Sequence, residues 1–120
     1  MLTLPPSVKI YLSVQPVDMR KSFDGLATQV QSVLEEDPLS GHLFAFFNRR
    51  GDIAKILWWS SGGLCLYCKR LERGRFRWRR PADADATHVE MDAADLAMLL
   101  EGIDLMQTRR QSRWSRRRAA

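Results

Sequence analysis

Apolar and polar residues alternate along several short stretches of the chain, and one longer stretch has the period of a helix. The stretch from Lys9 to Val14 alternates loosely and contains β-forming residues, so we expect a first strand that ends before Pro16. From Phe23 to Leu34 the apolar residues recur at helical spacing, and Ser22 precedes them as a candidate N-cap. The helix must end before Asp37-Pro38, because the residue before a proline is pushed out of the α region.

Four β-rich runs follow this helix, and short turn-forming segments separate them. The runs are His42 to Phe47, Ile53 to Trp59, Leu64 to Arg70 and Arg75 to Arg79. Each break is short enough for a hairpin, whereas parallel neighbours would need a crossover of roughly a dozen residues or more. The spacing therefore predicts an antiparallel meander whose apolar face is covered by the first helix.

A further short strand and a second helix are predicted beyond Pro81. The stretch from Thr87 to Met91 has strand character, and Asp92 with Asp95 three residues later forms a capping arrangement. A leucine-rich stripe follows, and Gly102 is the natural point for this helix to end. The predicted fold class is α+β: an antiparallel β-meander of four to six short strands packed against an N-terminal amphipathic helix, with a short C-terminal helix.

The length and composition are those of one globular domain. The chain has 120 residues, of which 45% are apolar and 28% charged. We assign residues 1–108 to a single domain and residues 109–120, which carry six arginines, to a disordered arginine-rich tail. No segment approaches the roughly 20 apolar residues of a membrane span, and the first residues lack a secretory signal, so we expect a cytoplasmic protein without a membrane partner.

Charge is divided unevenly along the chain. Residues 49–80 carry ten basic and two acidic groups, whereas residues 81–108 carry seven acidic groups and no Lys or Arg. Blocks of like charge are typical of surfaces that meet a polyanion, so DNA is one expected partner. The alternative is that the two segments neutralise each other across the folded surface, and the sequence leaves both interpretations open.

The segment from Arg75 to Arg79 alternates strictly between arginine and aromatic residues. On a strand, Phe76 and Trp78 would point to one face and the three arginines, here called the arginine ladder, to the other, with a repeat of roughly 6.6 Å. That repeat is close to two phosphate rises of roughly 3.4 Å each. The alternative is a solvent-facing strand that its charges protect from edge pairing. Our candidate DNA-binding residues are the ladder and the neighbouring basic positions: Arg49, Arg50, Lys69, Arg70, Arg73, Arg75, Arg77, Arg79 and Arg80.

The sequence contains only weak candidates for catalytic or metal-binding motifs. Cys65 and Cys68 form a lone C-x-x-C, and on a strand these positions point to opposite faces, so we interpret them as reduced sheet residues. Asp18, Asp24 and Asp52 are scattered and lack the convergent spacing that a two-metal nuclease needs. We therefore expect no enzyme activity, no metal site and no cofactor.

Successive blocks of the chain resemble a known family. The blocks lie within roughly residues 5 to 105 and are Pro16 to Leu26, Asp37 to Phe44, Lys55 to Trp59, Gly63 to Leu66, Lys69 to Phe76 and Leu99 to Asp104. Their order and content are similar to those of the TnpB accessory protein, the product of the second open reading frame, of the insertion sequence 66 family of bacterial transposons. The resemblance implies a role in transposition beside a separate, larger transposase that carries the catalytic acids.

Two hypotheses follow for how such a protein acts. In the first, the arginine ladder and the hairpin tips hold DNA while another chain cuts it. In the second, the protein is an assembly factor that binds the transposase or another accessory protein of the same element without contacting DNA. The candidate partner-binding residues are Asp18, Met19, Arg20, Lys21, Phe23, Asp24, Trp58 and Trp59. The segment from Asp18 to Lys21 also has a structural interpretation, as a lead-in to the first helix.

Overall fold

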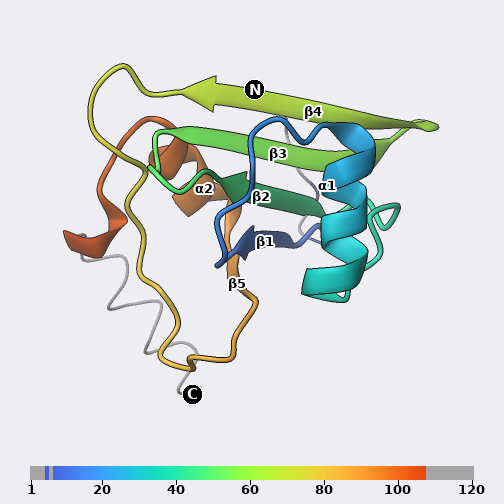
Figure 1. The fold of residues 1–120 in the computed structure, drawn as a ribbon, viewed down its shortest axis with the longest axis horizontal. Helices are drawn as coiled ribbons and strands as arrows, with labels where there is room; N and C mark the ends of the chain where they lie inside the picture. The colour runs from blue at the N-terminus through green and yellow to red at the C-terminus, as the bar shows by residue number, and fades with distance from the viewer. Residues whose placement is uncertain (1–4, 6, 108–120) are drawn as a thin grey trace.

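Five strands form one mixed sheet in the order β4-β3-β2-β1-β5 (Figure 1). The computed structural model describes residue 5 and residues 7–107. The strands are β1 Ile10–Ser13, β2 Leu43–Phe47, β3 Ile53–Ser60, β4 Gly63–Arg70 and β5 His88–Met91. Strands β2, β3 and β4 are antiparallel neighbours, β1 runs parallel to β2, and β5 is antiparallel to β1.

The predicted α+β fold is confirmed, with one correction to the meander. The expected strands at residues 9–14 and 87–91 are present as β1 and β5, and β2 to β4 form the meander. The fourth run, Arg75 to Arg79, is not a strand. Between β3 and β4 the turn is tighter than the predicted break, because Ser61 and Gly62 adopt positive φ angles of 49° and 82° and the strands extend up to them.

One face of the sheet is covered by the helix that connects β1 to β2. This helix comprises α1 Phe23–Gln29 and a π-helical continuation, η1 Val30–Leu34. Its buried residues Leu26, Val30 and Leu34 pack against apolar side chains of β2 and β3 in one core cluster. The crossover is long enough to permit the parallel pairing of β1 with β2.

Two details at the start of α1 differ from the sequence prediction. Ser22 occupies the N-cap position, but its side chain makes no capping hydrogen bond; its carbonyl accepts from the backbone N–H of Leu26 at 2.8 Å. Phe23, which the helical spacing placed on the apolar stripe, is 43% exposed. The reason is its position in the first turn, before the helix lies over the sheet.

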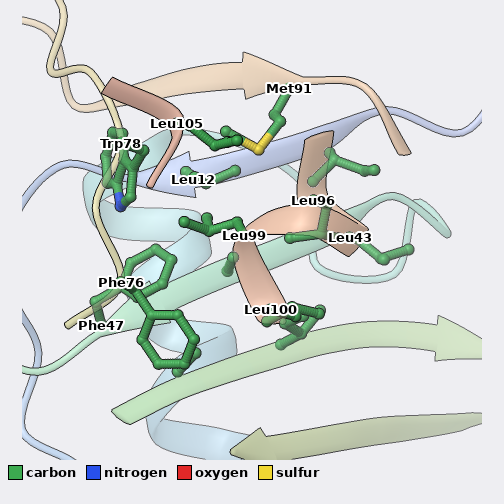
Figure 2. Close-up of a cluster of buried hydrophobic side chains, with 14 residues drawn as sticks. Leu12, Leu43, Phe47, Phe76, Trp78, Met91, Leu96, Leu99, Leu100 and Leu105 are labelled. Carbon is green, nitrogen blue, oxygen red and sulfur yellow. The ribbon is translucent and has the colours of Figure 1, made fainter. Parts of the chain in front are cut away.

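The second face is covered by the C-terminal part of the described chain. Here α2 Ala93–Leu100 and the short 3-10 helix η2 Leu105–Gln107 lie over the sheet together with two aromatic side chains from residues 76–78 (Figure 2). The predicted cap is confirmed, because the Asp92 side chain accepts from the backbone N–H of Asp95 at 2.8 Å. Gly102 has a φ of 87° and follows the end of α2, as predicted.

Candidate nucleic-acid interface

The hairpin between β2 and β3 fixes the position of the arginine-rich segment that follows β4. The backbone N–H of Leu71 donates to the carbonyl of Asp52, and that of Phe76 donates to the carbonyl of Gly51, both at 2.8 Å. These bonds direct the chain across the end of the hairpin instead of along the free edge of β4. Residues 75–79 are therefore extended but have no strand neighbour, which explains why the predicted strand is absent.

The predicted sidedness of this segment is nevertheless correct. Phe76 and Trp78 are 5% and 3% exposed, whereas the three ladder arginines are exposed. Both aromatic rings pack against Phe47 of β2, each with a centroid separation of 5.7 Å (Figure 2). The buried and exposed side chains alternate because one side of this segment packs onto the sheet face. The segment does not pair with a strand of the sheet.

The hairpin tip and the arginine-rich segment together form an open hollow of about 240 Å³. We call it the arginine hollow, and its lining residues are Arg49, Arg50, Gly51, Arg75, Phe76, Arg77, Trp78, Arg80 and Met106. Five of the nine predicted DNA-binding residues thus lie around one depression. The sequence could not reveal this, because it depends on the contact between the hairpin and residues 75–80.

The five arginines of the hollow differ in their partners. Nε of Arg77 lies 3.2 Å from the Asp104 carboxylate, and Nε of Arg50 lies 3.8 Å from that of Asp52. Within the described part of the chain, Arg49, Arg75 and Arg80 have no ion pair. These contacts neutralise only part of the positive charge of the hollow.

Arg80 has a distinct environment at the hollow. Its guanidinium carbon lies 4.0 Å from the centroid of the Trp78 ring, a cation–π contact. Burial lowers the pKa of Arg80 below its usual value, although the group remains charged at neutral pH. The stack holds the planar guanidinium in a defined orientation.

The four other predicted DNA-binding residues do not line the hollow. Lys69 donates from Nζ to the carbonyl of Leu100 at 2.7 Å, which stabilises the C-terminal end of α2. Arg70 lies 3.8 Å from Glu72, while Arg73 and Arg79 are exposed. Lys69 thus has a structural contact that the sequence did not indicate.

Asn48 organises the hairpin tip, and sequence reasoning did not include it in the site. Its Oδ1 accepts from the backbone N–H groups of Gly51 and Ile53 at 2.9 and 3.0 Å, and its Nδ2 donates to Asp52 at 2.7 Å. That last bond, with a smaller contribution from nearby arginines, lowers the pKa of Asp52. An asparagine at the start of a turn was the available signal. Asp104 and Met106 carried no comparable signal.

The segment from Asp18 to Lys21 is tied to its own residues and to the sheet. Arg20 donates from Nε and Nη2 to the Asp18 carboxylate at 3.0 and 2.6 Å, and this hydrogen bonding lowers the pKa of Asp18 to about 2. Lys55 of β3 donates from Nζ to the carbonyls of Met19 and Lys21 at 2.8 and 2.9 Å. These contacts favour the structural interpretation, a lead-in that delivers the chain to α1.

The remaining partner-binding candidates are distributed over both faces of the sheet. Asp24 and Phe23 are exposed in the first turn of α1. Trp58 packs against the core cluster on the α2 side, and Trp59, the next residue of β3, points to the opposite side. Both indoles are half-buried, so the eight candidates do not form one continuous surface.

The described residues contain no group of three His, Cys, Asp or Glu side chains that could hold a metal ion. Cys65 and Cys68 are free thiols, and their positions opposite Trp58 and Lys55 confirm that they lie on different faces of the sheet. No helix in residues 5 and 7–107 is long and apolar enough to cross a membrane.

Comparison with known proteins identifies relatives along most of the chain. The family model described as IS66 Orf2 like protein matches residues 8–110. The uncharacterized protein y4hO of Sinorhizobium fredii is 40% identical over 104 residues, which cover 87% of this chain and 88% of that protein. The uncharacterized protein y4jC of the same organism is 33% identical over 104 residues, covering 87% and 86% of the two chains. No solved structure matches the chain.

Proposed function

Because the chain belongs to the IS66 Orf2-like family, which indicates an accessory role in transposition, we propose that it is a non-catalytic protein that contacts DNA beside a separate transposase. The observation that carries this proposal is the arginine hollow, where five guanidinium groups from two segments surround one depression. Arginine is well suited to phosphate, because its planar fork donates two parallel hydrogen bonds.

The base of the hollow supports a binding role. Phe76 and Trp78 are buried against Phe47, so the backbone that carries the neighbouring arginines is fixed before any ligand arrives. A preorganised site loses less conformational entropy on binding. Arg73 and Arg79 extend the basic surface beyond the hollow and are available for further phosphate contacts.

The proposed absence of catalysis rests on the surroundings of the scattered acids. The Asp18 carboxylate is bound by Arg20, and that of Asp52 by Asn48. Asp24 lies in the first turn of α1, where its charge complements the helix dipole. In this proposal, DNA cleavage belongs to the transposase. Nicking of element ends by the pure protein with magnesium, lost in Asp52→Asn, would contradict it.

The DNA contact can be tested with a labelled duplex over a series of salt concentrations. In the triple variant Arg49→Gln, Arg75→Gln and Arg80→Gln, the affinity should fall, and the salt slope should decrease by about 0.9 for each phosphate contact that is lost. The charge-matched control is Lys9→Gln, Arg20→Gln and Lys21→Gln, which should change both quantities little. Equal losses in the two variants would show that net charge alone drives binding, and absence of binding at low salt would contradict the proposal.

A second function, assembly with the transposase, is favoured by the exposure of Phe23. Phe23 is 43% exposed and follows the Asp18–Arg20 pair closely in the sequence, so its apolar ring provides an anchor for a protein partner. Phe23→Ser should reduce co-purification with the transposase of the same element while DNA affinity is retained. Leu39→Ser, at a residue that is 52% exposed, is the control and should have no effect. Unchanged co-purification in Phe23→Ser would reject this surface.

A further inference from the structure

The arginine hollow has more hydrogen-bond donors than the acceptors around it use. Three of its guanidinium groups, those of Arg49, Arg75 and Arg80, have no ion pair among the described residues. The indole N–H of Trp78 is buried and has no hydrogen-bond partner within the same part of the chain. Buried polar groups without a partner are rare in folded proteins, and a bound ion is one of the explanations for such a group.

We propose that the arginine hollow binds a phosphate monoester, the group at a phosphorylated end of a DNA strand. This inference rests on the proposed function and specifies which part of the DNA the hollow recognises. An internal phosphodiester has one negative charge and two free oxygens. A monoester has three strong acceptor oxygens and a charge of about −1.5 to −2 at neutral pH. Three guanidinium groups without an ion pair among the described residues match the monoester better.

The shape of the hollow supports the same choice. Its walls come from the hairpin tip at Arg49, Arg50 and Gly51, from residues 75–80 and from Met106, so donors are present on more than one side. A terminal phosphate can enter such a depression, whereas an internal phosphate of a duplex lies along a continuous backbone. The exposed Arg79 lies outside the hollow and remains available for that backbone.

The acidic groups near the hollow do not oppose an anion. Asp104 is bound to Arg77 at 3.2 Å, and Asp52 accepts from Asn48 at 2.7 Å and lies 3.8 Å from Arg50. These two carboxylates therefore already have partners. The Arg80 guanidinium is held at 4.0 Å from the centroid of the Trp78 ring, and its planar fork can donate to two phosphate oxygens.

The first experiment compares two duplexes of the same sequence that carry a 3′ dye and differ only in having 5′-phosphate or 5′-hydroxyl ends. The full chain should bind the phosphorylated duplex about tenfold more tightly, the equivalent of one charge-assisted hydrogen bond. Arg80→Gln and Trp78→Phe should lose this preference, and Arg73→Gln, outside the hollow, should keep it. Equal affinity of the full chain for the two duplexes would overturn the inference and leave the proposed DNA contact intact.

The second experiment uses inorganic phosphate alone, with sodium chloride at equal ionic strength as the reference. Phosphate should shift the NMR signals of the Trp78 indole N–H and the Arg80 side chain in the full chain. Absence of a shift would overturn the inference whatever the DNA result. A shift without binding to either duplex would mean that the hollow accepts phosphate from another source; the DNA-end inference and the proposed function would then both fail.

Discussion

The carbonyl of Gly51 accepts a hydrogen bond from the backbone N–H of Phe76 at 2.8 Å. This bond joins the tip of the β2–β3 hairpin to the arginine-rich segment after β4, two parts of the chain that each carry basic residues of the candidate site. Gly51 can make it because the backbone there has a φ of 82°, a conformation that costs a residue with a Cβ about 1–2 kcal/mol. The geometry of the arginine hollow thus depends on one turn residue.

Gly51→Ala should therefore lower the free energy of unfolding by about 1–2 kcal/mol, because alanine is strained at this positive φ. Urea denaturation of the variant and the parent chain measures the difference. Gly63→Ala is the control, since a Cβ at Gly63 meets nothing within 4 Å and its φ is ordinary. A loss of similar size at both positions would show that the strain at Gly51 is not the cause.

Substitutions of the buried aromatic residues and of the exposed arginines in residues 75–79 should differ in their effect on stability. Trp78→Ala removes a ring that is 3% exposed and should destabilise the protein by about 3–5 kcal/mol. Arg79→Gln changes an exposed side chain and should alter stability by less than about 0.5 kcal/mol. Thermal and chemical denaturation test both. A loss of less than about 1 kcal/mol in Trp78→Ala would show that Trp78 does not belong to the core.

Lys55→Met should destabilise the protein by about 2 kcal/mol, because two carbonyls lose a charged hydrogen-bond donor. Lys9→Met serves as the control: its Nζ lies 3.9 Å from Glu90, both side chains are more than half exposed, and the loss should stay below about 1 kcal/mol. Chemical denaturation at neutral pH compares the two variants. A larger destabilisation in Lys9→Met than in Lys55→Met would contradict the role of Lys55 as an anchor of the Asp18–Lys21 segment.

The contact between Asp18 and Arg20 should appear as a pH effect at acid pH. The hydrogen bonds from Arg20 lower the pKa of Asp18 from 3.8 to about 2, so this carboxylate binds its proton more weakly in the folded chain. The stabilisation is fully present above about pH 4 and is lost as the pH falls toward 2. An NMR titration of the Asp18 carboxyl carbon should give a midpoint near 2, and Arg20→Gln should return it toward 3.8. An identical midpoint in the two proteins would contradict the contact.

Residues 109–120, the predicted tail, lie outside the described residues. Their contribution to DNA binding can be tested by removing their positive charge. Replacing its six arginines with glutamine in the full chain should reduce the salt slope of DNA binding by about 5, at roughly 0.9 per phosphate contact. The affinity should fall for every duplex sequence, because phosphate contacts do not read bases. An unchanged slope would assign the DNA contact to the arginine hollow and its neighbours alone.

Local patterns along the chain predicted most of the elements correctly. Short β-rich runs separated by turn-forming segments gave β1 to β5, helical spacing gave α1 and its continuation, and the capping pair Asp92 and Asp95 marked the start of α2. Each of these signals depends on residues close in sequence. The prediction failed at residues 75–79, because alternation reports that one side is buried and does not report whether the backbone pairs with a strand.

The candidate site was harder to predict from the sequence, because it depends on contacts between residues that are far apart along the chain. The basic residues were identified by composition, but the grouping of Arg49 with Arg75 and Arg80 results from the hydrogen bond between Gly51 and Phe76. Arg77 forms an ion pair with Asp104, which lies 27 residues later in the chain. Sequence spacing contains no information on either contact, so it could not separate the paired arginines from the unpaired ones.

The position of Met106 in the wall of the arginine hollow has a consequence for avidity. The arginines of residues 109–120 are covalently joined to the protein just beyond this wall. When a DNA strand occupies the hollow, a second contact from these arginines is intramolecular, at an effective concentration on the order of millimolar for a short linker. If both places bind DNA as proposed, one small protein would act as a bivalent DNA binder, and modest affinities at the two places would combine into slow dissociation.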